Sequence, residues 1–378
     1  MQFRDLQKQY HVLKEDIDNS IQQVLLDGNF ISGQQVTELE KELAEYVGVR
    51  HCITCANGTD ALTLALMVWN IGPGDAVFVP DFTFFSSGEV VVFEGAVPIF
   101  VDVEEDTFNI SPESLEQAIQ KVLEEGKLSP KVIIAVDLFG QPADFIRIRA
   151  IAEKYDLLVL EDGAQGFGGR IGEKRACSFG DISTTSFFPA KPLGCYGDGG
   201  AIFTDNDEWA DLLKSYRVHG KGKNKYDNIR IGMNSRLDTL QAAVLQVKLS
   251  AFREYELRDV NKIANRYTKI LNGVVQVPVV KENFYSSWAQ YSIMLKNETE
   301  RDKLRQHLNE NNIPSMIYYS KPMSQQKAFD KMCCKLVDLP VTEEICKRVL
   351  SLPLHPYMSS DEQDKVIDAV KRFYNNLM

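Results

Sequence analysis

The stretch Leu157-Leu158-Val159-Leu160-Glu161-Asp162-Gly163-Ala164-Gln165 places two acids directly after a run of four apolar residues. Such a run is typical of a strand buried in a parallel sheet. Open α/β sheets bind ligands at the carboxyl ends of their strands, so Asp162 is predicted to lie where a ligand binds. A carboxylate buried there needs a positive partner, and a protonated pyridine nitrogen is one such group. A helix-cap or turn role for Asp162 remains open on these residues alone.

Working outward from this strand, short apolar runs alternate with amphipathic helical stretches. This alternation predicts an α/β fold with a mostly parallel sheet. The predicted strands are 52–55, 76–79, 98–101, 132–136, 157–160, 183–187 and 201–204, and the predicted helices include 61–69, 112–124 and 145–155. After about Ser235 the pattern changes to long helical stretches over 237–271, and a final helix is predicted over 360–377. We therefore predict a large domain over residues 1–240, followed over 241–378 by long helices and a small α+β domain.

A lysine follows the predicted strand 183–187. Lys191 stands between Pro189 and Pro192, and the glycine-rich stretch Gly197-Asp198-Gly199-Gly200 comes shortly after it. An aromatic, poorly solvated setting lowers the pKa of a lysine and makes its amine nucleophilic enough to form a Schiff base. Glycines let the backbone approach a ligand closely. Taken alone, the motif favours a surface lysine in a loop.

The stretch Asn57-Gly58-Thr59-Asp60-Ala61-Leu62 follows a predicted strand and opens a predicted helix. Its backbone N–H groups and the Thr59 hydroxyl form an anion site at the helix N-terminus. Simple helix capping by Thr59 or Asn57 uses the same geometry and stays open. The glycines at 166, 168 and 169 do not open an apolar helix, so they do not predict a dinucleotide site.

The composition of the chain limits the classes of macromolecule that it is expected to bind. The 378 residues carry a net charge of -11 with a pI of about 5.1, which argues against a nucleic-acid or anionic-membrane partner. No apolar run reaches the roughly 18 residues of a spanning helix. The odd number of cysteines, 7, suits reduced thiols in the cytoplasm. Cys52 and Cys55 lie in a strand-like stretch without a second pair at metal spacing, so they are predicted to be buried side chains and no metal site is predicted.

Together these motifs, with the stretch 186–191 and Asn234-Ser235-Arg236-Leu237-Asp238, resemble the DegT/DnrJ/EryC1/StrS family of sugar aminotransferases over nearly the whole chain. The resemblance implies the aspartate-aminotransferase-like fold type I of pyridoxal-phosphate (PLP) enzymes, with a central, mostly parallel seven-stranded sheet. It also implies a homodimer with shared active sites. Within the family, residues 187–200 and 234–238 are most similar to enzymes that aminate C3 of UDP-2-acetamido-2-deoxy-3-keto-glucuronate. Such an enzyme would use L-glutamate as donor and serve bacterial polysaccharide or lipopolysaccharide biosynthesis.

The resemblance also implies roles for individual residues. Lys191 is the Schiff-base lysine and general acid/base, and Asp162 is the partner of the pyridine nitrogen. Lysine at 191 favours amino transfer, because the dehydratase branch of the family carries histidine there. The remaining cofactor contacts are Gly58, Thr59, Asp60 and Ser186 around the phosphate, Phe84 on the ring face, Gln165 near the ring, and Asn234 reaching the phosphate from the partner subunit.

The predicted substrate contacts are Arg236, Tyr318, Tyr319, Lys225 and Tyr226. Lys225 and Tyr226 belong to a locally basic stretch, 219–230, which suits a nucleotide diphosphate or a solvated loop. Arg236 offers a bidentate fork to a uronate carboxylate. Where relatives have His-Tyr-Pro this chain has Tyr318-Tyr319-Ser320, which keeps a dTDP-3-keto or 4-keto-6-deoxy sugar open. A PLP-binding regulator without catalysis also stays open, whereas a nicotinamide oxidoreductase is disfavoured because its glycine fingerprint is incomplete.

Overall fold

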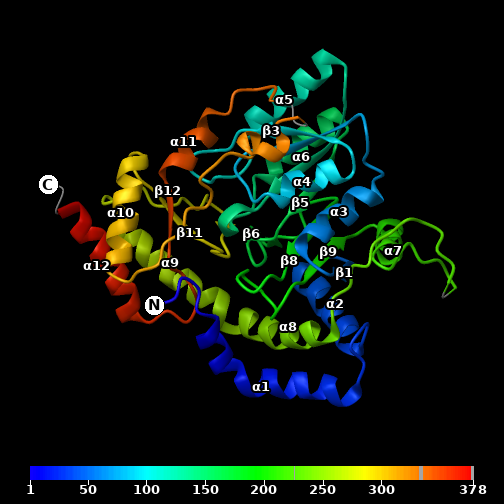
Figure 1. Cartoon of the computed structure of the whole chain (residues 1–378), viewed down its shortest axis with the longest axis horizontal. Helices are drawn as coiled ribbons and strands as arrows, with labels where there is room; N and C mark the ends of the chain where they lie inside the picture. The colour runs from blue at the N-terminus through cyan, green and yellow to red at the C-terminus, as the bar shows by residue number, and fades with distance from the viewer. Residues whose placement is uncertain (225, 332–334, 376–378) are drawn as a thin grey trace.

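A computed structural model describes residues 1–224, 226–331 and 335–375. Its centre is a seven-stranded sheet in the order β1-β9-β8-β5-β4-β2-β3 (Figure 1). The strands are β1 (His51–Cys55), β2 (Asp75–Pro80), β3 (Val97–Val101), β4 (Ser129–Val136), β5 (Leu158–Asp162), β8 (Ile182–Ser186) and β9 (Gly200–Thr204). Only β9 pairs antiparallel with its neighbours, β1 and β8, and the other pairs are parallel. The predicted mostly parallel sheet is confirmed, with every predicted strand in it.

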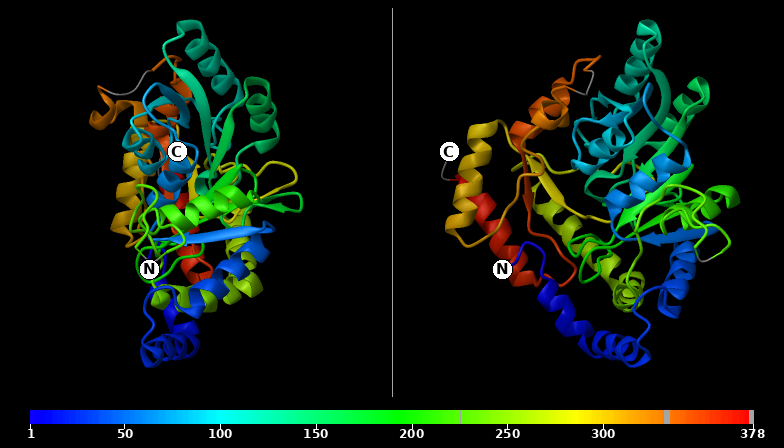
Figure 2. Two further views of the ribbon diagram at one scale, coloured as in Figure 1. Left: turned by 90° about the vertical axis from the view of Figure 1, so that its right-hand side faces the viewer. Right: turned by 45° about the vertical axis from the view of Figure 1, so that its right-hand side comes forward.

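Helices cover both faces of this sheet (Figure 2). One face packs against α3 (Gly58–Val68), α4 (Ser86–Phe93) and α7 (Asp207–Tyr216), and the other against α2 (Gln34–Val47), α5 (Pro112–Glu125), α6 (Phe145–Tyr155) and α8 (Thr239–Ala251). The sequence of β4 is apolar over 132–136, where the strand is buried on both faces. Val132 and Ile134 join the core under α3, whereas Ile133 and Ala135 join the core under α5 and α6. In a strand that is buried on both faces, apolar residues do not alternate with polar ones.

Two helix starts follow from their capping residues. Ser111 Oγ accepts a hydrogen bond from Ser114 N at 3.2 Å, and Pro112 occupies the first turn of α5. At α3, Asn57 Oδ1 accepts from Asp60 N at 2.8 Å. Asn57 is therefore the cap of α3, and the Thr59 side chain is not used for capping.

The second half of the chain begins with a long helical rod. It consists of α8, a π-helical turn (η2, Phe252–Glu256) and α9 (Leu257–Leu271), in agreement with the helical stretch predicted over 237–271. Helix α1 (Leu6–Asp27) lies along α8, and the N-terminus lies beside α12 (Ser360–Asn375) (Figure 1). A small antiparallel sheet of β11 (Tyr291–Met294) and β12 (Val349–Leu352) shares a core with α9, α10 (Glu298–Glu310) and α12. The domain division at residue 240 stays a prediction.

The remaining elements are short. They are β6 (Arg170–Ile171), β7 (Lys174–Arg175), β10 (Phe284–Tyr285), α11 (Pro340–Arg348) and the 3-10 turns η1 (Leu138–Gly140), η3 (Met323–Gln325) and η4 (Lys327–Phe329). Strands β10, β6 and β7 form a three-stranded sheet that the sequence did not predict. Among the described residues, no helix combines the length and apolar character needed to span a bilayer.

A pair of buried acids lies under the carboxyl end of the sheet. Glu161 in β5 accepts hydrogen bonds from Cys177 N at 2.5 Å and from Ser183 Oγ and Phe179 N, both at 2.7 Å. The carboxyl group of Asp137 is buried beside that of Glu161, and the two like charges disfavour each other. Burial, reinforced by the charge of Glu161, raises the pKa of Asp137 well above its usual range. Burial raises the pKa of Glu161 as well, but the donors of Ser183, Cys177 and Phe179 oppose that rise.

Replacing Asp137 by asparagine should make stability less dependent on pH. Because the pKa of Asp137 is higher in the folded chain than in the unfolded chain, its protonation contributes to the free energy of unfolding of the wild type. This contribution is complete below the pKa of Asp137 in the unfolded chain. It is lost as pH rises toward the pKa of Asp137 in the folded chain. An amide at this position holds no titratable proton. Thermal melts should show the Tm of Asp137→Asn rising relative to wild type between about pH 5 and about pH 8. Asp368→Asn, on the exposed side of α12, is the control, and parallel pH profiles for Asp137→Asn and wild type would contradict the prediction.

Candidate functional site

A cavity of about 670 Å³ lies at the carboxyl ends of β5 and β8. Asp162 ends β5, Ser186 ends β8, and the first turn of α3 completes the same wall. This is the edge of the sheet where the sequence predicted a ligand. The predicted site residues that line the cavity are Gly58, Thr59, Asp60, Phe84, Asp162, Gln165, Ser186, Lys191, Tyr318 and Tyr319.

Asp162 and Lys191 are the charged pair of the cavity. Only 6% of Asp162 is exposed, and its Oδ2 accepts a hydrogen bond from Ser87 Oγ at 2.8 Å. Burial raises the pKa of Asp162, while Ser87 and the charge of Lys191 act against that rise. Burial likewise lowers the pKa of Lys191, and the charge of Asp162 opposes the shift. The arrangement supplies a nucleophilic amine next to a buried carboxylate that pairs with a cationic ligand group.

The N-terminus of α3 presents neutral hydrogen-bond donors to the cavity, beside the acidic side chain of Asp60. The N–H groups of a first helical turn have no acceptor within the helix and point at a ligand. Thr59 Oγ1 and Ser86 Oγ lie 2.9 Å apart and contribute hydroxyls, as does Ser186 across the turn. A Cβ on Gly58 would lie 2.7 Å from Ser186 Cβ, so the close approach of these two segments requires glycine at 58.

The opposite wall is aromatic and amide-rich. Gln165 Oε1 accepts from Phe139 N at 2.9 Å, and its Nε2 donates to the Tyr319 hydroxyl at 3.3 Å, which fixes the Gln165 side chain. The Phe84 ring is 53% exposed and available to a planar ligand. Gln290 Oε1 is buried in the wall, and no donor in the described part of the chain reaches it. It is a free acceptor for a ligand hydroxyl or amide.

Three of the predicted residues lie outside this cavity. Arg236 Nη2 donates to Asn234 Oδ1 at 2.6 Å, and neither side chain lines the cavity. Ser235 between them accepts from Ala56 N at 3.0 Å, which anchors the segment beside the start of α3. Tyr226 lines a different pocket. Lys225, the other predicted contact of the basic stretch, lies outside the described residues.

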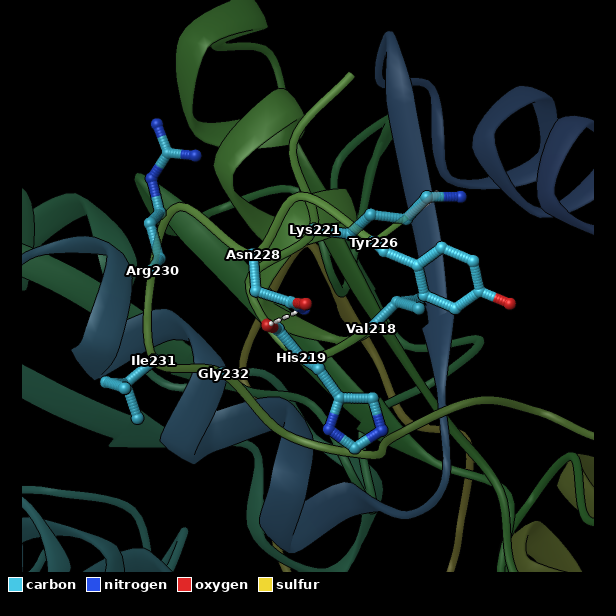
Figure 3. A pocket seen from close by; sticks show the side chains of 8 residues that line it. All are labelled: Val218, His219, Lys221, Tyr226, Asn228, Arg230, Ile231 and Gly232. Carbon is cyan, nitrogen blue, oxygen red and sulfur yellow. Dashed lines mark hydrogen bonds between the residues drawn. The ribbon is translucent and has the colours of Figure 1, made fainter. Parts of the chain in front are cut away.

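That second pocket is built by the basic stretch itself. It has a volume of about 540 Å³ and is lined by Val218, His219, Lys221, Tyr226, Asn228, Arg230, Ile231 and Gly232 (Figure 3). Asn228 Nδ2 donates to the His219 carbonyl at 2.8 Å, while Arg230 extends away from Lys221 and Tyr226. The pocket shares no lining residue with the cavity around Lys191. Within one chain, Tyr226 therefore lines a different pocket from Asp162 and Lys191.

The sequence reasoning missed Ser86, Ser87 and Gln290. Ser86 and Ser87 follow the predicted strand 76–79 after a short loop, so their position at a carboxyl end of the sheet was a usable signal. Gln290 precedes β11 in the second half of the chain, and no local motif marks it. It reaches the cavity only through tertiary packing.

Comparisons with known proteins agree with this geometry. The sequence model of the DegT/DnrJ/EryC1/StrS aminotransferase family matches residues 11–371. The chain is 43% identical over 361 residues to the UDP-2-acetamido-2-deoxy-3-oxo-D-glucuronate aminotransferase of Pseudomonas aeruginosa, covering 95% of this chain and 96% of that protein. A DegT DnrJ EryC1 StrS aminotransferase structure from Brucella abortus superposes with a TM-score of 0.96 at 49% identity, over 99% of each chain. The PLP form of Spr1654 from Streptococcus pneumoniae superposes with a TM-score of 0.88 at 25% identity, over 96% and 97% of the two chains.

Proposed function

Because the chain belongs to the DegT/DnrJ/EryC1/StrS aminotransferase family, we propose that it transfers an amino group from L-glutamate to a keto sugar carried on a nucleotide, with PLP as cofactor. The membership confirms the resemblance predicted from the sequence motifs. It also confirms the predicted aspartate-aminotransferase-like fold. The observation that carries the proposal is the convergence of Lys191, Asp162 and the α3 N-terminus on one cavity.

The residues present fit PLP. Asp162 would hold the protonated pyridine nitrogen, and Lys191 would carry the cofactor covalently. The neutral donors of Gly58, Thr59, Ser86 and Ser186 would take the phosphate, while Phe84 would cover a ring face. When bound, PLP accepts the electron pair left on carbon after proton removal. The buried carboxylate at Asp162 is the feature that this chemistry requires.

The chain's own groups then move and hold the protons. Once the amine of glutamate had replaced Lys191 on PLP, the freed Nζ, whose pKa burial lowers, would take the Cα proton as a general base and later return it as a general acid. The Ser87 hydrogen bond and the charge of Lys191 favour the ionised form of Asp162, because both oppose the rise in its pKa that burial causes. Gln165 is fixed by Phe139 and Tyr319, so it can orient a ring hydroxyl.

The sugar we propose is a UDP-linked 3-keto uronate, UDP-2-acetamido-2-deoxy-3-keto-glucuronate. The similarity to the Pseudomonas aeruginosa enzyme over almost the full chain supports it. Arg236, which does not line the cavity of its own chain, would offer the carboxylate a fork from the partner subunit. Purified enzyme with glutamate should aminate the uronate with a kcat/KM at least about tenfold above that for a dTDP-3-keto-6-deoxy or a 4-keto-6-deoxy sugar. Arg236→Met should remove this preference. A higher kcat/KM for either deoxy sugar in the wild-type enzyme would refute the uronate assignment.

We also propose a homodimer whose sites combine residues of both subunits. In one chain, Asn234 lies outside the Lys191 cavity, and large apolar side chains such as Leu26, Phe30 and Ile231 are exposed. Co-expressing Lys191→Ala with Asn234→Ala chains tests the arrangement, because a mixed dimer with shared sites regains one complete site. After random mixing about half of the dimers are mixed, so the activity of the whole preparation should reach about a quarter of wild type. Mixed preparations no more active than the two variants alone would exclude sharing.

The location we propose is the cytoplasm, and the process is bacterial polysaccharide biosynthesis. Five described cysteines are buried free thiols, as is typical of a reducing compartment. The two remaining cysteines, Cys333 and Cys334, lie outside the described residues. Deleting the gene should remove the 3-amino sugar from the cell-surface glycan, and an unchanged sugar composition would count against this process.

Gly58→Ala should weaken PLP binding. The added Cβ meets Ser186 Cβ at 2.7 Å and separates the two segments that form the phosphate seat. Titration of apoprotein with PLP should give a Kd raised about tenfold, equivalent to the loss of one charge-assisted hydrogen bond. Gly72→Ala is the matched control, because its added Cβ comes no closer than 3.8 Å to the Glu94 carbonyl. Equal Kd values for the two variants would contradict the assignment of this seat.

A further inference from the structure

The segment Phe3–Asp5, ahead of α1, contacts the turn that carries Lys191. Arg4 Nη2 donates to the carbonyl of Lys191 at 2.8 Å and to that of Pro192 at 3.4 Å. The two carbonyls belong to the turn after β8, 187 and 188 residues away along the chain. A planar guanidinium that donates to two successive carbonyls restricts their orientation. The backbone of Lys191 is thus held from the N-terminus.

The same segment also contacts the second half of the chain. The Phe3 carbonyl accepts from Leu354 N at 3.2 Å, and the Phe3 ring meets the Tyr318 ring edge-on with centroids 6.2 Å apart. Tyr318 lines the Lys191 cavity. Asp5 Oδ1 then caps α1 by accepting from Lys8 N at 2.9 Å, which fixes where the segment enters the helix. Three consecutive residues therefore join the Lys191 turn, the cavity wall and α1.

The charge of Arg4 lies within the electrostatic reach of one acid. Glu256 in the π-helical turn is its acidic neighbour, and that carboxylate also accepts from Gln9 Nε2 at 2.7 Å and the Tyr357 hydroxyl at 2.5 Å. The two charged groups that act on the Lys191 amine are Asp162, which raises its pKa, and Arg4, which lowers it. Arg4 thus has two effects on Lys191. It fixes the Lys191 backbone, and it places a positive charge near the Lys191 amine.

We propose that Arg4 is a positioning residue for amino transfer: it orients the turn that carries Lys191 and connects it, through Phe3, to Tyr318 in the cavity wall. The inference rests on the proposed role of Lys191 as the PLP-bearing lysine. Arg4 contacts neither the cavity nor its ligand, so it acts through Lys191.

The test uses the PLP-loaded enzyme and three variants. Arg4→Met removes both the charge and the fork, Arg4→Lys keeps the charge alone, and Arg305→Met, on the exposed side of α10, is the control. The visible absorbance of bound PLP, titrated with pH, reports the pKa of the PLP–Lys191 linkage. Arg4→Met should raise this pKa by about one unit and the PLP Kd about tenfold. Arg4→Lys should keep the wild-type pKa while its Kd rises about threefold, because an ammonium cannot replace the fork.

A purely structural role would lower Tm and leave the titration unchanged. The proposal is therefore overturned if folded Arg4→Met gives the pKa and Kd of wild type and Arg305→Met. If Arg4→Met does not fold, the test rests on Arg4→Lys. A PLP Kd and a kcat of Arg4→Lys that both equal those of wild type then overturn the proposal. Borohydride reduction and peptide mass mapping of the wild-type enzyme test the proposed role of Lys191 separately from that of Arg4. PLP on another lysine refutes the proposed role of Lys191, whereas PLP on Lys191 with an unaffected Arg4→Met refutes only the role of Arg4.

Discussion

Lys191→Ala should lower kcat for amino transfer by about 10⁴-fold or more, the upper range for loss of a positioned general acid/base. The variant loses both the covalent attachment of PLP and the amine that moves the Cα proton. Burial lowers the pKa of this amine, which favours its neutral, basic form. A rapid-mixing experiment with glutamate should show the visible band of bound PLP decaying in the wild type and persisting in the variant.

Two further variants show whether the loss is specific to this amine. Lys191→Arg keeps a positive charge near Asp162 but offers no nucleophilic amine, so it should be as inactive as Lys191→Ala. Lys214→Ala, in an exposed pair with Asp211 on α7, should retain wild-type kcat. If Lys191→Ala turned over glutamate within about tenfold of wild type, a PLP-binding role for another lysine would have to replace the present assignment.

Asp162→Asn should lower kcat by about 10²–10³-fold, as expected when one preorganised electrostatic group is removed. An amide is nearly isosteric but cannot keep the pyridine nitrogen protonated, so the cofactor no longer accepts electrons well. The Ser87 hydrogen bond can persist to the amide oxygen. The effect should therefore appear in the rate of the glutamate half-reaction, with KM and Tm close to wild type.

The neighbouring acid supplies the matched comparison. Glu161 precedes Asp162 on the same strand, but its carboxylate is held by Cys177 N, Phe179 N and Ser183 on the other side of β5. Glu161→Gln should lower Tm and leave the half-reaction rate within about threefold of wild type. The half-reaction rate of Ser87→Ala should lie between those of Glu161→Gln and Asp162→Asn, because this change removes one donor from Asp162. A half-reaction as slow in Glu161→Gln as in Asp162→Asn would mean that Asp162 acts through the fold and not through the cofactor.

The central sheet could be predicted because its signals are local. Each of its strands is buried on one or both faces, so apolar runs such as 132–136 and 157–160 mark it directly. The sheet of β10, β6 and β7 could not be found in this way. Its strands have two residues each, they are partly or fully exposed, and β10 comes more than a hundred residues after β6. Only the pairing of β10 with β6 is long-range, whereas β6 and β7 form a very short local hairpin.

The same distinction applies to the site. Lys191, Asp162 and Gly58 lie in motifs with a defined place at strand and helix ends, which is why they could be predicted from the sequence. Arg4 and Gln290 lie in no motif, and they reach the site by packing across the chain. The spacing of Gly166 and Gly168 resembles a nucleotide-binding motif, but the structure gives a steric reason for glycine at both positions. A Cβ at 166 would meet Asp137 Oδ2 at 2.3 Å, and Gly168 has φ +96°.

The groups proposed for proton transfer and those proposed for sugar choice are attached to different parts of the fold. Asp162 ends β5 and Lys191 follows β8, two strands that are paired in parallel. Arg236 and Tyr318 belong to loops, where substitutions are tolerated better than in a sheet. The fold is therefore modular for laboratory evolution. Libraries at 236 and 318 should yield many folded enzymes with new sugar preferences, whereas libraries at the ends of β5 and β8 should mostly yield inactive ones.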